Sequence, residues 1–179
     1  MRKPGFVSFS GKSQRPPRPS LFDAAANVKI RLFSQHDLND ILKVQNACKG
    51  IAVWQPHDYE QLARDPRGML LVAERNDRML PEIAGFSAFY RIEKEAELWN
   101  IAVAPAHRRR GIGRALLQEA LQKLSVAGTR RIFLEVRESN LPALELYYSL
   151  GFNRLARRKD YYYNPKEDAL VFVLKLSPP

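Results

Sequence analysis

The sequence predicts an α/β (α+β) fold in which helices pack on one mixed, twisted β-sheet. Segments 69–74, 82–91 and 97–103 have strand-like apolar patterns and are separated by short polar turns, which indicates an antiparallel meander. A strand, a helix and a second strand then follow one another between residues 97 and 137. Such a unit forms a right-handed crossover between parallel strands. With further strands near 28–32, 153–161 and 169–176, about seven strands and about four helices are expected.

The composition is that of a globular protein with a basic surface. Of the 179 residues, 45% are apolar and 27% are charged, and the formal net charge is +10. No apolar run approaches the ~18 residues that a membrane-spanning helix needs. The single cysteine, Cys48, excludes an intrachain disulfide and a Cys-based zinc site. The positive charge favours anionic ligands without choosing among phosphates, nucleic acids and acidic surfaces.

Residues 1–27 are predicted to be a disordered, basic, Pro/Ser-rich tail, and residues 28–179 the folded domain. The tail holds five basic residues and one acidic residue, and its four prolines prevent a regular helix. An organelle transit peptide is the alternative interpretation, but such a peptide needs an amphipathic helix that the prolines disfavour.

The first half of the domain is expected to begin with a half-buried strand at 28–32, where apolar and polar residues alternate. Ser34 and Asp37 form a capping-box pattern that starts a helix running to about Lys49. A shorter helix covers 58–64 and stops at Pro66. The three strands of the meander follow.

The second half begins with a basic loop at 104–110. Apolar residues at helical spacing predict a helix over 111–126, which Gly128 ends. A strand at 131–137 leads to a helix over 140–150, capped by Asn140 and ended by Gly151.

Residues 108–114, Arg-Arg-Arg-Gly-Ile-Gly-Arg, lie between a predicted strand and a predicted helix. Free backbone N–H groups and the positive end of the helix dipole favour anions at such a place, and glycine lets a ligand approach the backbone closely. We therefore expect a pyrophosphate cradle; a basic loop with a glycine turn is the alternative. Leu116 stands where a dinucleotide-binding fingerprint would have its third glycine.

The segments Leu98–Leu117 (LWNIAVAPAHRRRGIGRALL) and Phe133–Phe152 (FLEVRESNLPALELYYSLGF) resemble the two signatures of the GCN5-related N-acetyltransferases, the GNAT family. Arg108, Gly111 and Gly113 fill the family's [Q/R]-x-x-G-x-[G/A] motif. Within the family the resemblance is to the RimI type, which acetylates the N-terminal alanine of a small-subunit ribosomal protein. It is dense over about 97–174 and does not cover the tail.

The resemblance implies a fold with splayed central parallel strands and acetyl-CoA as co-substrate, with no metal. The pantetheine arm would lie along β-strand backbone, the pyrophosphate on the basic loop, and Asn140 near the pantetheine end. The implied acetyl-CoA-binding residues are Ile101, Ala102, Val103, Arg108, Arg109, Arg110, Gly111, Ile112, Gly113, Arg114, Asn140 and Tyr147.

The reaction needs a base, an acid and a dipole for the oxyanion, because an amine arrives protonated and a thiolate leaves. Glu135 is the expected base: it lies mid-strand among apolar neighbours, where loss of hydration favours the proton-bound carboxyl group. Pairing with Arg131 or Arg137 is the alternative role. Tyr147 is the expected acid, with a role as a core aromatic as the alternative. A backbone N–H near 102–103 would meet the oxyanion.

Other candidates are weaker. Cys48, His36, His57 and His107 show neither nucleophile nor metal-ligand spacing. Trp54, and Tyr161–Tyr163 on a loop facing it, could grip an acceptor peptide. RimI-type chains carry Pro-Trp near this point, whereas this chain has Val53-Trp54, so the loop differs.

We therefore predict an N-acetyltransferase that moves acetyl from acetyl-CoA to a protein N-terminus, in particular the N-terminal alanine of a ribosomal protein, by direct attack. The alternatives are a lysine or small-amine acceptor and, third, a non-enzymatic ribosome- or nucleic-acid-binding module. We expect a cytoplasmic monomer or weak dimer that binds neither membranes nor nucleic acid directly.

Overall fold

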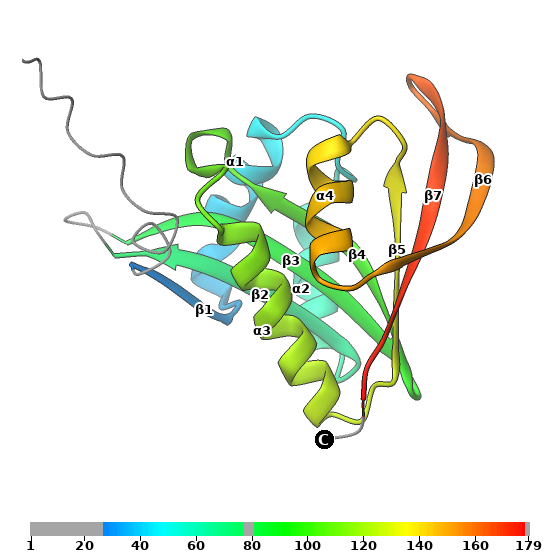
Figure 1. Cartoon of the computed structure of the whole chain (residues 1–179). Coiled ribbons are helices and arrows are strands. Elements are labelled where there is room, and N and C mark those ends of the chain that lie inside the picture. The colour runs from blue at the N-terminus through cyan, green and yellow to red at the C-terminus, as the bar shows by residue number, and fades with distance from the viewer. Residues whose placement is uncertain (1–26, 77–80, 178–179) are drawn as a thin grey trace, which may run out of the picture.

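The computed structural model describes residues 27–76 and 81–177 (Figure 1), within which seven strands form one sheet in the order β1-β2-β3-β4-β5-β7-β6. Only β4 and β5 pair in parallel, and the other neighbours are antiparallel. The mixed sheet is therefore confirmed. Its strands are β1 (Val28–Leu32), β2 (Gly68–Arg75), β3 (Glu82–Ile92), β4 (Glu95–Val103), β5 (Arg131–Arg137), β6 (Asn153–Tyr163) and β7 (Lys166–Lys175).

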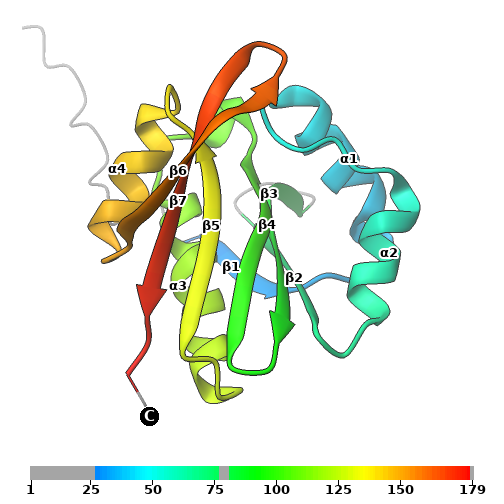
Figure 2. The ribbon, with the colours of Figure 1, turned by 90° about the vertical axis from the view of Figure 1, so that its right-hand side faces the viewer.

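Helices cover both faces of the sheet (Figure 2). One face carries α3 (Ile112–Val126) and α4 (Leu141–Ser149), and the other carries α1 (Leu38–Ala47) and α2 (Pro56–Arg64). Each layer has its own apolar core. Leu116, Leu117 and Leu124 of α3 pack with Leu134 and Phe172 in the first core, while Ile41, Tyr59 and Phe86 pack in the second.

The parallel strands β4 and β5 separate part-way along their length. Their register runs from Glu95↔Arg131 to Leu98↔Leu134 and stops there, although β4 continues to Val103 and β5 to Arg137. The other edge of β4 stays paired with β3 as far as Val103. The β5-facing backbone groups of 99–103 are therefore left without a strand partner, and the two strands diverge as Figure 2 shows.

Trp99 is the extra residue of a β-bulge in β4. Leu98 pairs with Phe89 and Asn100 with Ala88, so Trp99 has no partner of its own on β3. The bulge reverses which residues face which layer: Leu98 packs in the α3 core, whereas Ala102 packs in the α1–α2 core. Ile101 and Val103 consequently turn their side chains toward the α3 side.

Most predicted elements are confirmed, and three details of the predictions are wrong. Helix α1 ends at Ala47, so Cys48 is its extended C-cap and not part of the helix. Residues Tyr161–Tyr163 belong to β6 and not to a loop, and β7 begins earlier than expected, at Lys166. An irregular register between Arg158 and Tyr162 lets the β6–β7 hairpin continue past polar residues that resemble a turn.

The predicted tail at 1–26 and most of the predicted turn at 76–78 lie outside the described residues. In the part of the chain that the structure describes, no helix is long and apolar enough to cross a membrane.

Candidate active site

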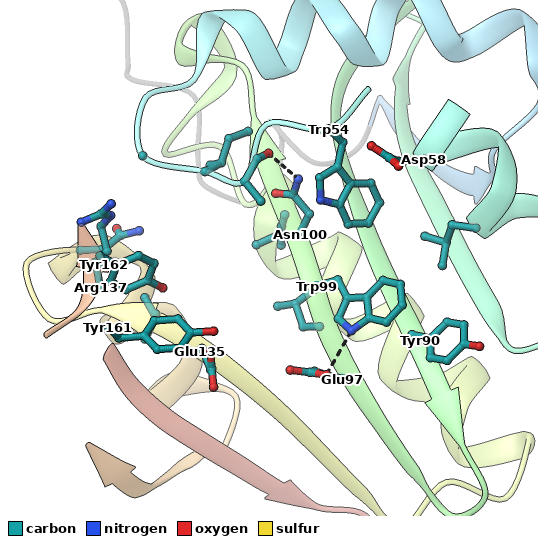
Figure 3. Close-up of a pocket in the computed structure, with 18 of the residues that line it drawn as sticks. Trp54, Asp58, Tyr90, Glu97, Trp99, Asn100, Glu135, Arg137, Tyr161 and Tyr162 are labelled. Atoms are coloured by element: carbon teal, nitrogen blue, oxygen red, sulfur yellow. Dashed lines mark hydrogen bonds between the residues drawn. The ribbon is translucent and has the colours of Figure 1, made fainter. Parts of the chain in front are cut away.

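A pocket of about 1010 Å³ opens where β4 and β5 part (Figure 3). Both diverging strands contribute to its wall, together with α2, the start of α4 and the β6–β7 hairpin. Three of the predicted site residues outside β4 line it: Glu135, Asn140 and Tyr147. The fold thus brings the expected base and the expected acid to one cavity.

Glu135 lies on β5 just beyond the last residue that pairs with β4, and its carboxylate faces the pocket. Its Oε1 lies 2.7 Å from Nη1 of Arg158 on β6, and its side chain is 17% exposed. The Tyr161 phenol also donates a hydrogen bond to Glu135, and this bond is the main reason why the pKa of Tyr161 is raised. The prediction that Glu135 lies in apolar surroundings is therefore wrong, because its neighbours include a guanidinium and a phenol.

The expected alternative partners of Glu135 are paired elsewhere. Arg131 forms an ion pair with Glu95, and Arg137 forms one with Glu167 at 3.2 Å. Arg137 also lies over the ring of Tyr162, with 4.0 Å between its Cζ and the ring centroid. The ion-pair partner of Glu135 is thus Arg158 on β6, a strand whose proximity to β5 cannot be read from the local sequence.

Tyr147 lies on α4 at the other side of the pocket and is 4% exposed. Its ring contacts Phe152 and Phe172, so it is also the core aromatic that the alternative interpretation described. Burial raises the pKa of the Tyr147 phenol far above its ordinary value of 10. Among the described residues its hydroxyl has no hydrogen-bond partner, so a proton held there is free to be donated to a ligand.

The basic loop forms the start of α3, and its backbone is unusual. Gly111, the N-cap of α3, has φ 77°, and Arg109 has φ 62°. Residues other than glycine rarely adopt this backbone conformation. No side chain caps the first turn of α3, so its N–H groups stay available. A Cβ at Gly113 would lie 3.3 Å from Leu146, so glycine lets α3 approach α4 closely.

The four arginines of the loop divide into two groups. Arg108 turns back toward the end of β4: its Nε donates to the carbonyl of Val103 at 3.1 Å, and an Nη donates to the sulfur of Cys48 at 3.4 Å. Arg114 donates to Ser149 at 2.7 Å and Arg109 lies 3.8 Å from Glu145, both on α4. Arg109, Arg110 and Arg114 are exposed beside the N-terminus of α3, where an anion would bind.

The remaining residues predicted to bind acetyl-CoA lie along a line from the pocket to the start of α3. Ile101, Ala102 and Val103 form the unpaired edge of β4, which leads from the pocket toward the loop that contains Gly111, Ile112 and Gly113. Asn140 caps α4 by accepting from the backbone N–H of Ala143 at 3.3 Å, and it also lines the pocket. This arrangement fits an elongated ligand that ends in a pyrophosphate. The unpaired edge of β4 would contact the middle of the ligand, and the free amides, glycines and arginines at the start of α3 would contact the pyrophosphate.

The α2 side of the pocket is aromatic, and hydrogen bonds fix the position of its loop. Buried Gln45 accepts from the backbone N–H of Trp54 at 2.8 Å and from the Tyr59 hydroxyl at 2.6 Å. Asn100 donates to the carbonyl of Ala52 at 2.9 Å, which ties the loop between α1 and α2 to β4 (Figure 3). Trp54, Tyr161 and Tyr162 line the pocket, whereas Tyr163 does not and is 88% exposed.

Four residues at or beside the pocket were not predicted as site residues: Arg158, Trp99, Asn100 and Glu97. Arg158 reaches Glu135 only through the pairing of β6 with β7 and of β7 with β5. Trp99 and Asn100 both line the pocket only because of the bulge. No local signal in the sequence marks either relationship.

The weaker candidates, Cys48, His36, His57 and His107, do not line the pocket. Cys48 is buried and contacts Val103 and Arg108, and His107 is buried between Arg75 and Glu82. Within residues 27–76 and 81–177, no group of three or more His, Cys, Asp or Glu side chains could hold a metal ion.

Residues 37–152 match the acetyltransferase (GNAT) family. The chain belongs to this family. The [ribosomal protein bS18]-alanine N-acetyltransferase of Escherichia coli strain K12 is 42% identical over 98 residues, which are 54% of this chain and 66% of that protein. A Bacillus subtilis protein with the provisional name [ribosomal protein bS18]-alanine N-acetyltransferase is 34% identical over 149 residues, 83% of this chain and 95% of that one.

The structural comparison agrees. The crystal structure of the ribosomal-protein-S18-alanine N-acetyltransferase from Escherichia coli superposes with a TM-score of 0.75 at 30% identity, covering 85% of this chain and 96% of that one. The GNAT fold is therefore confirmed for this chain. Its matched part spans just under two thirds of the Escherichia coli relative in the sequence comparison.

Proposed function

We propose that this GNAT protein transfers the acetyl group of acetyl-CoA to the N-terminal α-amino group of a ribosomal protein, with an N-terminal alanine as acceptor. The observation that carries the proposal is the pocket at the β4–β5 separation, which has Glu135 on one side and Tyr147 on the other. Two relatives named for the acetylation of the alanine of ribosomal protein bS18 support the choice of acceptor.

Acetyl-CoA would bind along the unpaired edge of β4, with its pyrophosphate at residues 109–114. It supplies an activated acetyl thioester. The N–H groups at the start of α3 would receive the phosphates, and Arg109, Arg110 and Arg114 would add positive charge. Gly113 leaves room for close approach, because any side chain there would press on Leu146.

The acceptor amine would enter from the α2 side. An α-amino group has a pKa of about 7.7–8.0, so most of it arrives protonated near neutral pH. Glu135, whose Oε1 lies 2.7 Å from Arg158, would accept that proton, directly or through a water molecule. Tyr147 keeps its proton, because burial raises its pKa, and would donate it toward the leaving sulfur. The attack is direct, with no covalent enzyme intermediate.

A peptide panel tests this proposal. Acetyl-CoA is supplied with a peptide that has a free N-terminal alanine, the same peptide blocked at its N-terminus but carrying a lysine, and a polyamine. Acetylation of the free N-terminus, located by mass spectrometry, is the expected result. Activity confined to the blocked peptide or the polyamine would contradict the proposed acceptor while leaving acetyl transfer in place. We place this activity in the cytoplasm, where ribosomal proteins are made and assembled.

A further inference from the structure

Glu97 is a carboxylate in the pocket wall that has no cationic partner among residues 27–76 and 81–177. It lies on β4 directly before the strands part, opposite Phe133, and its side chain faces the pocket (Figure 3). Its Oε2 accepts a hydrogen bond from the Trp99 indole N–H at 3.1 Å. Among the ion pairs of the described residues, none involves Glu97.

The other acidic groups of the pocket are engaged. Asp65 pairs with Arg67 at 2.9 Å and Glu135 pairs with Arg158. Asp58 accepts the backbone N–H of Gln55 at 2.7 Å and lies 3.2 Å from Nε2 of His57. Arg67 and Arg137, the basic residues in the lining, each have a carboxylate partner. In a chain with a net charge of +10, this wall therefore keeps an uncompensated negative charge at Glu97.

An aromatic surface lies next to that charge. Trp99 stacks on Tyr90, with ring centroids 4.4 Å apart and planes 9° from parallel, and Trp54 meets Trp99 edge-on at 6.2 Å. Trp99 is 42% exposed, which is unusual for an indole held in a stack. The indole N–H fixes the position of the Glu97 carboxylate relative to the exposed ring. A partly exposed indole beside a carboxylate favours binding of a cation, through cation–π attraction and an ion pair.

We propose that Glu97 and Trp99 bind an arginine or lysine side chain at one of the two residues that follow the N-terminal residue of the acceptor peptide. The inference rests on the proposed function. In that function the reacting amine lies at Glu135, and the acceptor peptide would run from there across β4 toward Tyr90 and α2. Phe133, opposite Glu97, precedes Glu135 by two residues on β5, so the carboxylates of Glu97 and Glu135 lie on facing strands near the separation. The acceptor class is therefore a basic protein N-terminus.

The test compares peptides that begin with alanine and differ only at the following two positions, which carry arginine, glutamine or glutamate. The wild-type enzyme should show a kcat/KM for the arginine peptide roughly tenfold above that for the glutamine peptide, and a further loss with glutamate. Added salt should reduce the preference, because the site is open to solvent.

Substitutions at Glu97 make the test specific. Glu97→Gln should remove most of the preference for arginine and leave kcat/KM for the glutamine peptide nearly unchanged. Glu97→Lys should make the glutamate peptide better than the arginine peptide. Glu119→Gln is the matched control, because Glu119 lies on α3 and pairs with Lys123 at 3.2 Å. Because Glu97 is exposed, melting temperatures of all variants should stay close to wild type.

The outcomes separate this inference from the proposed function. N-terminal acetylation without a preference for arginine, or a preference that survives Glu97→Gln, overturns the cation site alone. Acetylation of a polyamine, with no activity on any free N-terminus, overturns both. A preference that Glu97→Gln abolishes and Glu97→Lys reverses supports both.

Discussion

Arg158 lies 2.7 Å from Glu135, so the exposed edge strand β6 holds the proposed base of the reaction on β5. The ion pair limits the positions that the carboxylate can adopt. The Tyr161 phenol, from the same strand, contacts the same carboxylate. The β6–β7 hairpin thus forms a wall of the pocket and, in the proposed mechanism, would also position the base.

Replacing Arg158 with Met should lower kcat/KM for the acceptor roughly tenfold, because the base loses its orientation. Acetyl-CoA affinity should not change, since the cradle at residues 109–114 lies elsewhere. Steady-state kinetics with a free N-terminal peptide measure the first effect and calorimetry the second. Arg154→Met, an exposed arginine on the same strand, is the control. Equal loss in both variants would mean that the net charge of β6 matters and the ion pair does not.

Glu135→Gln should reduce turnover by about 10²–10⁴ near neutral pH, because the amide cannot accept the proton of the amine. Acetyl-CoA binding should remain nearly intact. Turnover measured across pH 6–9 is the decisive readout. A variant as active as wild type over that range would show that water or another group takes the proton.

Tyr147→Phe should lower kcat with little change in either Michaelis constant, which is the signature of an interaction made only in the transition state. The ring keeps its contacts with Phe152 and Phe172, so the melting temperature should hold. Tyr148→Phe is a close control, because Tyr148 is its neighbour on α4 and is 54% exposed. A rise in the acceptor KM at constant kcat would instead place Tyr147 in acceptor binding.

The pH dependence of the wild-type enzyme gives a separate check on Tyr147. Burial raises the pKa of this phenol, so it stays protonated as the pH rises to its ordinary value of 10 and beyond. Loss of the Tyr147 proton therefore should not limit kcat below about pH 10. If wild-type kcat falls with an apparent pKa near 8 or 9 and Tyr147→Phe removes that fall, the phenol is far more acidic in the working enzyme than its burial implies.

Gly113→Glu should abolish acetyl-CoA binding, because a carboxylate would occupy the anion site and its stem would press on Leu146, 3.3 Å from the added Cβ. Gly113→Ala separates the two causes, since it adds the steric contact without the charge and should weaken binding only modestly. Calorimetric titration of both folded variants makes the comparison. Wild-type affinity in Gly113→Glu would remove the pyrophosphate from this loop.

Much of the fold was predictable because its signals are local. Apolar periodicity placed the helices and the strands, and Asn140 and Gly111 mark helix starts that the structure confirms. The strand, basic loop and helix at 97–126 also predicted an anion site, because glycines and arginines beside a helix start favour a bound phosphate. Motif order pointed to the family, and through it to Glu135 and Tyr147.

The composition of the pocket depended on tertiary structure. Glu135 acquires Arg158 through strand pairings that join segments 23 residues apart in the chain, and short-range patterns do not encode that register. The bulge at Trp99 reverses the faces of β4, so strict alternation assigns Asn100 and Ala102 to the wrong side of the sheet. The sequence alone determined which elements form and which family signatures they carry, because those depend on neighbouring residues. Only the packed sheet decided which charges are paired and that Glu97 has no ion pair within the part of the chain that the structure describes, because pairing depends on side chains that folding brings together.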